Sequence, residues 1–133
     1  MPRTLGPYAG ATSLVLAAAA LLAFPGTPAQ AENPQIARGR AVYAEACAVC
    51  HGKDGGGGPG FANPIWGKGA QIAKFGHAAE LLVYTVMLMP FDDPTRLSDE
   101  DKLAATAYVL HRHGVLGEEA ELRQETAKSV VIR

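Results

Sequence analysis

The chain has 133 residues, enough for one small domain, and its 12 Lys and Arg against 13 Asp and Glu give a net charge of −1. A chain so nearly neutral lacks the excess positive charge by which proteins bind nucleic-acid backbones. Its only cysteines are Cys47 and Cys50, so a structural zinc site built from two cysteine pairs is also excluded.

Residues 1–31 are typical of a cleavable secretory signal. Arg3 precedes an apolar run over 13–24 that is too short to span a bilayer comfortably, and Ala29-Gln30-Ala31 follows it. The small residues of this last segment predict cleavage after Ala31, and an uncleaved membrane anchor is the alternative. We therefore expect export to the periplasm of a Gram-negative bacterium, with no membrane association after cleavage.

Residues 32–117 form the expected domain, which begins with a helix. Asn33 is a good N-cap and Pro34 a good first-turn residue, so the pattern predicts a helix from Pro34 toward Cys47. The small Gly39 on this helix would let it cross closely over the last helix of the domain.

Cys47-Ala48-Val49-Cys50-His51 is the attachment signature of a c-type haem. Two intervening residues let one helical turn present both thiols to a single porphyrin edge, and the adjacent imidazole can ligate iron. Zinc would need four ligands where the motif supplies three, and a redox dithiol would follow a strand, which the surrounding helical pattern does not offer. We expect one covalently bound haem c, with its iron, and a poorly folded apoprotein.

The segment after the motif is rich in glycine. Residues 52–60 are interpreted as a flexible loop, because no strand precedes them and no Lys-Ser/Thr follows, as phosphate binding would require. Residues 61–67 carry bulky apolar groups expected to wall a flat cofactor. Trp66 among them either belongs to the core or packs near a haem propionate or edge.

A second helix is predicted from about Ala78 until Pro90 ends it. Its expected buried face comprises Leu81, Leu82, Tyr84, Thr85 and Leu88.

The second axial position of the iron could be filled from this region or left open. The candidate ligands are Met87, Met89, His77, His111 and His113. Met89 is preferred, because Pro90 pushes it out of helical geometry into an extended segment that can lie across the far haem face. Met87 would then point the other way.

The clearest helix is predicted between Ser98 and Gly114. Ser98 is an N-cap, acidic residues fill the first turn and basic residues the last, so both ends complement the helix dipole. Leu103, Ala107 and Leu110 should form its buried stripe, with Tyr108 beside it. Residues 118–133 are expected to be a tail on the surface.

Taken together, the Cys47–His51 motif, Met89-Pro90 and the closing Ala107-Tyr108-Val109-Leu110 resemble a class I cytochrome c over residues 34–114. Residues 89–94 and 97–100 further resemble small periplasmic mono-haem cytochromes that accept electrons from sulfite-type dehydrogenases. The resemblance implies an all-α fold, with three to four helices and loops wrapped around one covalently bound haem.

The resemblance also implies roles for individual residues. Cys47 and Cys50 would carry the thioethers, His51 would be the proximal ligand and Met89 the distal ligand. A proline carbonyl would accept the free N–H of the proximal imidazole, and either Pro59 or Pro64 could supply it.

The expected function is one-electron transfer by a carrier that is not itself an enzyme. Its donor would be a periplasmic dehydrogenase, either sulfite dehydrogenase-like or a quinoprotein, and its acceptor a terminal oxidase or another cytochrome. A haem enzyme or gas-binding protein with an open distal site is one alternative, and a tightly bound subunit of a dehydrogenase is another. A basic rim for docking is hypothesised from Lys53, Lys68 and Lys74, with Arg38 or Arg40.

Overall fold

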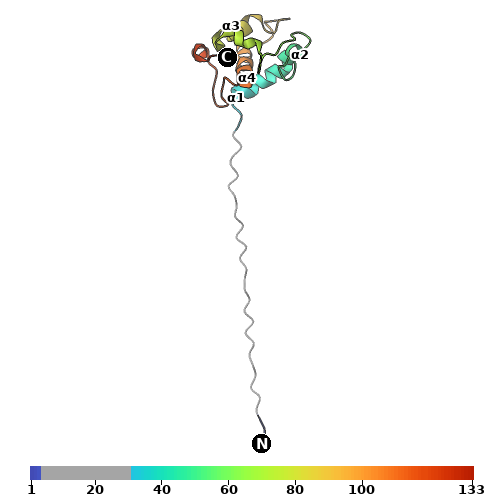
Figure 1. The fold of residues 1–133 in the computed structure, drawn as a ribbon, viewed down its shortest axis with the longest axis vertical. Helices are drawn as coiled ribbons and strands as arrows, with labels where there is room; N and C mark the ends of the chain where they lie inside the picture. The colour runs from blue at the N-terminus through green and yellow to red at the C-terminus, as the bar shows by residue number, and fades with distance from the viewer. Residues whose placement is uncertain (4–30) are drawn as a thin grey trace.

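The computed structural model describes residues 1–3 and 31–133, and within them the fold is all-helical (Figure 1). The helices are α1 (Pro34–Val42), α2 (Ala48–His51), α3 (Ala78–Leu88) and α4 (Asp99–His113), with a π-helical turn η1 (Tyr43–Cys47) and 3-10 turns η2 (Gln71–Phe75) and η3 (Ala127–Ser129). Strand-like pairing in the described part is limited to two isolated bridges, Gly58 with Phe61 and His77 with Val131. The expected all-α class is confirmed.

Most of the predicted signal, including the apolar run over 13–24, lies outside the described residues. The predicted cleavage after Ala31 and the division at residue 118 therefore stay predictions. None of the helices within 1–3 and 31–133 combines the length and the apolar character needed to cross a membrane.

The first helix begins as its sequence predicts. The Asn33 side chain accepts hydrogen bonds from the backbone N–H groups of Gln35 (2.8 Å) and Ile36 (3.4 Å), and Pro34 occupies the first turn. Helical backbone then continues through η1 and α2 until Gly52, whose φ of 80° ends it. The cysteine motif thus forms the last turns of this continuous helical segment.

The domain is built on the crossing of α1 and α4, which lie against each other in Figure 1. Gly39 makes the approach possible: a β-carbon there would overlap the carbonyl oxygen of Ala104 and lie 2.8 Å from the Tyr108 Cβ. Ile36, Ala107 and Leu110 are buried beside the crossing. The predicted close crossing at Gly39 is confirmed.

The caps of α4 hold its two ends. The Ser98 hydroxyl accepts the N–H of Asp101 at 3.1 Å, and Gly114 adopts a left-handed conformation with φ of 85°. Ala107, Tyr108 and Leu110 are buried as expected, while Leu103 is only half-buried.

Helix α3 differs from prediction in the face that it buries. Leu81 and Leu82 are buried, but Tyr84 and Leu88 are exposed. Val83 and Met87 are exposed as well, so the outward side of α3 is apolar. Because apolar residues occur all around this helix, periodicity alone could not identify its core side.

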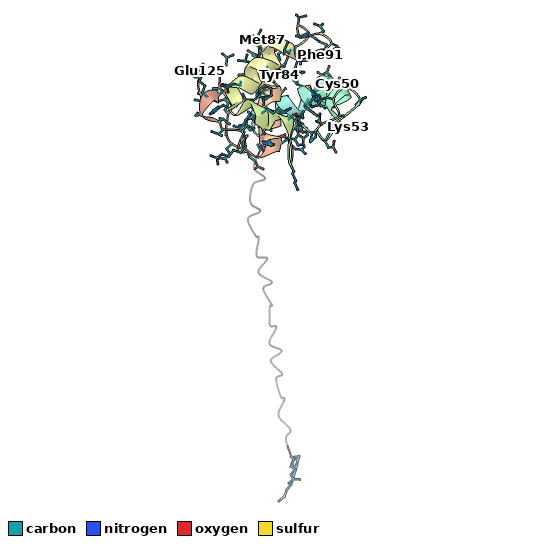
Figure 2. The ribbon with its side chains drawn as sticks, turned by 45° about the horizontal axis from the view of Figure 1, so that its top comes forward. Cys50, Lys53, Tyr84, Met87, Phe91 and Glu125 are labelled. Carbon is teal, nitrogen blue, oxygen red and sulfur yellow. The ribbon has the colours of Figure 1, made fainter. Side chains whose placement is uncertain are left out.

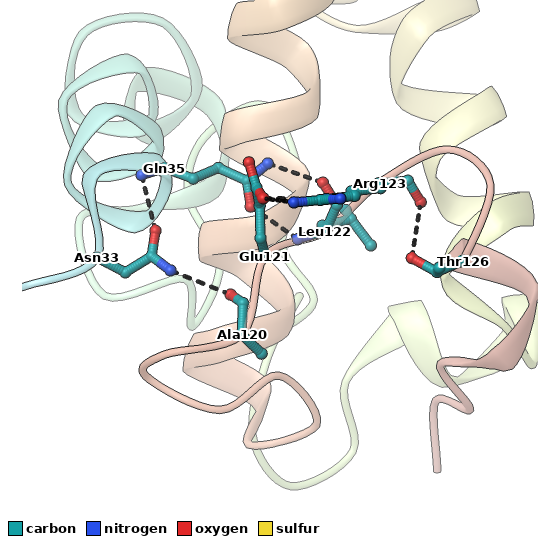
Figure 3. Close-up of polar contacts among 7 residues, drawn as sticks. All are labelled: Asn33, Gln35, Ala120, Glu121, Leu122, Arg123 and Thr126. Carbon is teal, nitrogen blue, oxygen red and sulfur yellow. Dashed lines mark hydrogen bonds and ion pairs between the residues drawn. The ribbon is translucent and has the colours of Figure 1, made fainter.

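Residues 118–133, which are expected to be a tail on the surface, pack against the domain. Side chains at the start of α1 hold them by hydrogen bonds to their backbone. The Gln35 amide donates to the Leu122 carbonyl and accepts its N–H, both at 2.8 Å, and the Asn33 amide donates to the Ala120 carbonyl (Figure 3). Leu122 and Ile132 are buried. With Ala127, which is also buried, the tail adds three side chains to the core.

Candidate functional site

The cysteine motif lies where the helical segment tightens from η1 into α2. Both thiols are free, with Cys47 half-buried and Cys50 exposed. Burial raises the pKa of the Cys47 thiol to about 11, with a smaller lowering by the charge of Arg96. Cys47 is therefore a neutral thiol at neutral pH, and Cys50 stands at the domain surface.

The glycine-rich segment after the motif folds back onto it through backbone hydrogen bonds, and the expected flexibility of this loop stays a prediction. The N–H of Gly57 donates to the His51 carbonyl at 3.1 Å, and the N–H of Phe61 donates to the Cys50 carbonyl at 3.1 Å. A β-carbon at Gly60 would lie 2.6 Å from the Cys50 Sγ atom. The missing side chain at Gly60 leaves room for the Cys50 thiol.

The His51 imidazole is half-buried, and its ring meets the Phe61 ring edge-on with centroids 5.2 Å apart. Burial lowers the pKa of His51, which favours the neutral ring. Its Nδ1 atom is buried and has no hydrogen-bond partner. The predicted bond to the carbonyl of Pro59 or Pro64 is therefore not formed; the Pro64 carbonyl accepts the N–H of Gln71 instead.

These residues fit a covalently attached haem. Two free thiols with helical spacing lie next to a neutral imidazole that keeps a buried, unpartnered nitrogen. The unpartnered atom is Nδ1, the position of the expected bond to a proline carbonyl, so the other ring nitrogen, Nε2, is the one that would ligate iron.

Trp66 belongs to the core. It is 8% exposed, and its ring lies 4.9 Å from that of Tyr43 and edge-on to that of Tyr108, while the Arg112 guanidinium stands 5.0 Å above it. The Tyr43 hydroxyl donates to the Gly52 carbonyl at 2.6 Å. This aromatic cluster ties the end of the cysteine motif to α4.

Met89 follows α3 in an extended conformation, with φ of −116° and ψ of 140°, as the effect of Pro90 predicts. Its side chain is half-buried, whereas that of Met87 is 67% exposed. We call residues 89–97 the strap. The environment of the two methionines differs as expected, and the ligand role of Met89 stays a prediction.

The strap is held internally by its own side chains. The Arg96 guanidinium makes two hydrogen bonds to the Asp92 carboxylate, at 2.7 and 3.3 Å. Asp93 accepts both the N–H and the hydroxyl of Thr95, at 2.9 and 2.7 Å.

The three alternative histidines are engaged or exposed elsewhere. His77 is the exposed N-cap residue of α3, 3.9 Å from the Glu80 carboxylate. His111 contacts the Leu116 carbonyl through Nδ1 at 3.2 Å. His113 accepts the N–H of Gly67 on Nδ1 and contacts the Arg133 carbonyl through Nε2.

Of the residues suggested for a basic rim, the arginines are paired. Arg38 contacts Glu100 and Asp101, and Arg40 contacts Glu32 at 2.6 Å. Any free positive charge of the hypothesised rim therefore rests on exposed lysines, namely Lys53, Lys68 and Lys74. Figure 2 shows Cys50 and Lys53 on the side of the domain away from Glu125.

Sequence reasoning missed Lys102, which is 3% exposed. Its ammonium donates to the carbonyls of Val86 (2.6 Å) and Pro94 (2.5 Å), beside the strap. The pattern offered no clear signal, because Lys102 lies about 100° around the helix from Leu103 in the predicted buried stripe.

An apolar groove of about 520 Å³ lies along the outer side of α3. Its lining residues are Phe75, Ala79, Glu80, Val83, Tyr84, Met87, Leu88 and Lys128. This set includes neither the cysteine motif nor Met89.

Residues 34–109 match the family model described as cytochrome c oxidase, cbb3-type, subunit III, whose members are c-type cytochrome domains. The chain belongs to this family. The family implies that the cytochrome carries covalently bound haem c with iron, and Cys47, Cys50 and His51 lie within the matched residues.

Two groups of known proteins resemble the cytochrome. It is 38% identical over 97 residues to the thiosulfate dehydrogenase of Stutzerimonas stutzeri, covering 65% of its own length and 30% of that enzyme. Among solved structures it resembles the sulfane dehydrogenase SoxCD of Paracoccus pantotrophus, at 27% identity and a TM-score of 0.59, covering 73% of its own chain and 52% of the other. The thiosulfate dehydrogenase TsdBA of Marichromatium purpuratum also matches, at 31% identity, a TM-score of 0.45, and 62% and 18% coverage. The cytochrome thus spans about a third to a half of the first relatives in each group.

Proposed function

We propose that this cytochrome is a periplasmic one-electron carrier with one covalently attached haem c, held between His51 and Met89. The observation that carries the proposal is the placement of two free thiols, with helical spacing, next to a half-buried imidazole in a chain of the c-type cytochrome family. When bound, haem iron supplies reversible one-electron exchange between its ferric and ferrous states.

Each residue of the motif would have its own role in holding the haem. Cys47 and Cys50 would form the thioether bonds, for which both must be free thiols, and the structure joins them in no disulfide. His51 would supply the proximal nitrogen, and the lowering of its pKa by burial keeps the ring neutral at neutral pH, the form that binds metal. Because Cys50 is exposed, the thioether edge would face solvent and offer a small surface for brief electron-transfer encounters.

Met89 is the proposed distal ligand. Its extended backbone and half-buried side chain distinguish it from the exposed Met87 two residues earlier. A thioether is a weak donor to ferric iron, so methionine in this position raises the reduction potential relative to a second histidine. With both axial positions filled, a diffusing carrier is favoured over a catalyst with an open site.

The donor we propose is a dehydrogenase of inorganic sulfur compounds. The names of the thiosulfate and sulfane dehydrogenases to which the chain is similar support this class. A sulfite dehydrogenase-like enzyme fits the same chemistry, a quinoprotein is the other donor to test, and a terminal oxidase or second cytochrome is the proposed acceptor. Because the chain matches only part of each relative, it could also act as a stable subunit.

Spectroscopy of the matured protein tests the cofactor and its ligands. Intact mass should exceed that of the polypeptide by one haem, and the ferric form should show a thioether-to-iron charge-transfer band in the red. Met89→Ala should abolish this band, and the matched Met87→Ala variant should keep it. A product with the bare polypeptide mass would overturn the proposal, and a high-spin spectrum in the native protein would favour a haem enzyme or gas binder.

Location and partner are tested separately. The full-length chain, expressed with haem-attachment machinery, should appear in the periplasmic fraction with Glu32 as its first residue. Purified candidate dehydrogenases should reduce it at different rates, and gel filtration with and without each enzyme separates a diffusing carrier from a bound subunit. Cytoplasmic retention, or reduction by none of the sulfur dehydrogenases, would contradict the corresponding part of the proposal.

A further inference from the structure

Lys102 is a buried cation whose partners are backbone carbonyls. Lysine is almost never fully buried unless it is paired, yet this side chain on α4 is 3% exposed. Its ammonium donates to the carbonyl oxygens of Val86 at 2.6 Å and of Pro94 at 2.5 Å. Hydrogen bonds from a charged donor contribute more to stability than neutral ones.

In the sequence, the two residues that supply these carbonyls lie on either side of Met89. Val86 is in the last turn of α3, where carbonyl groups lack partners within the helix and the helix dipole is negative. Pro94 is in the middle of the strap. Lys102 therefore joins the end of α3 to the strap. Along the chain, Met89 lies between the two residues that Lys102 holds, Val86 and Pro94.

The helix that carries Lys102 is firmly placed. α4 is capped at both ends and packed on α1 through Gly39. The strap, in turn, is held in shape by the Asp92–Arg96 and Asp93–Thr95 contacts, all of which lie within the strap itself. A tether from α4 to Pro94 therefore fixes the position of the strap as a unit.

We propose that Lys102 is a positioning residue that holds the Met89 thioether in its ligand position. The proposal rests on the assignment of Met89 as the distal ligand. Displacing the strap would break the charge-assisted hydrogen bond to the Pro94 carbonyl and leave the buried ammonium with the Val86 carbonyl as its remaining partner, which is costly. Lys102 thereby makes opening of the strap rare and keeps the distal position closed to external ligands.

Entry of imidazole into the ferric holoprotein measures this opening. Imidazole must displace the Met89 thioether, so its binding rate reports how often the strap opens. In Lys102→Met, which keeps the apolar stem but loses the charge, we expect this rate to rise at least tenfold. The exposed Lys128 on η3 provides the matched control, and Lys128→Met should stay within twofold of the wild-type rate.

A chemical rescue isolates the ammonium. Because both native cysteines would be bound to haem, Lys102→Cys adds the single free thiol, which can be alkylated in denaturant and the protein then refolded. Modification with 2-bromoethylamine recreates a lysine-like ammonium and should return the imidazole rate to near wild type. A neutral alkyl group of similar length should leave the rate high.

Three outcomes would overturn the inference. An unchanged imidazole rate in a folded Lys102→Met variant shows that the tether does not control the strap. Loss of helical far-UV circular dichroism in both Lys102→Met and the Lys102→Cys protein with the neutral alkyl group shows that Lys102 stabilises the whole domain and not the strap in particular. Equal rates for the two alkylated proteins show that charge is irrelevant. Failure of the Met89 assignment is distinguishable, because Met89→Ala would then leave the spectrum of the holoprotein unchanged.

Discussion

Gly39 on α1 lies directly against the backbone of Ala104 on α4, with no space for a side chain between them. We expect Gly39→Ala to force the helices apart and to lower the free energy of unfolding by about 1–3 kcal/mol, as overpacking typically does. Denaturant unfolding followed by circular dichroism measures the loss. Gly117→Ala is the control, because a β-carbon there meets nothing within 4 Å; equal stability of the two variants would contradict the crossing.

Gly60 should matter for attachment of haem. A methyl group at this position would press on the Cys50 sulfur, which lies 2.6 Å from where it would be placed. Gly60→Ala should therefore lower the fraction of exported chain that carries haem, measured by intact mass. The matched Gly56→Ala variant, whose nearest neighbour is the Asp54 carboxylate at 3.4 Å, should mature normally. Equal haem content in both would show that Cys50 tolerates the crowding.

Asp101 should make stability depend on pH. The Ser98 hydroxyl and then Arg38 hold the pKa of this carboxyl below its usual 3.8. A lowered pKa stabilises the fold above the unfolded value, and the contribution is lost as pH falls through the folded value. Asp101→Asn should therefore be less stable than wild type at pH 7, and the difference should shrink below about pH 3.8. Asp99→Asn in the same helical turn is the control, and a pH-independent difference would contradict the assignment.

Gln35 should hold the C-terminal tail on the domain. Its amide pairs with both backbone groups of Leu122, and Gln35→Ala would leave that N–H and carbonyl without their partner. We expect a loss of about 1–3 kcal/mol in local stability and faster proteolysis within residues 118–133. Gln124→Ala, which changes an exposed tail residue, should be cleaved at the wild-type rate. Unchanged cleavage of Gln35→Ala would mean that burial of Leu122 suffices.

Local signals account for what the sequence predicts well. Asn33, Ser98 and Gly114 act on the backbone within a few residues of themselves, and Pro90 sets the conformation of Met89 directly. The cysteine motif is equally local. Each of these features needs no knowledge of what packs against it.

Features decided by distant packing were missed. Gly57 and Phe61 donate hydrogen bonds back to the cysteine motif, a path of the glycine segment that its composition does not reveal. The outer side of α3 is as apolar as its inner side, so the pattern could not choose between them. Lys102 is a charged residue outside the predicted buried stripe, and its contacts become visible only when the strap lies beside α4.

The pairing of α1 with α4 also determines when the domain can fold during its synthesis. Arg38 and its partner Asp101 are 63 residues apart, so the first helix is made long before the helix that completes it. In the export that we propose, the domain cannot close until its C-terminal half has crossed the membrane. We expect the two thiols to stay accessible to the attachment enzymes throughout that interval, so that haem can be attached before the domain folds.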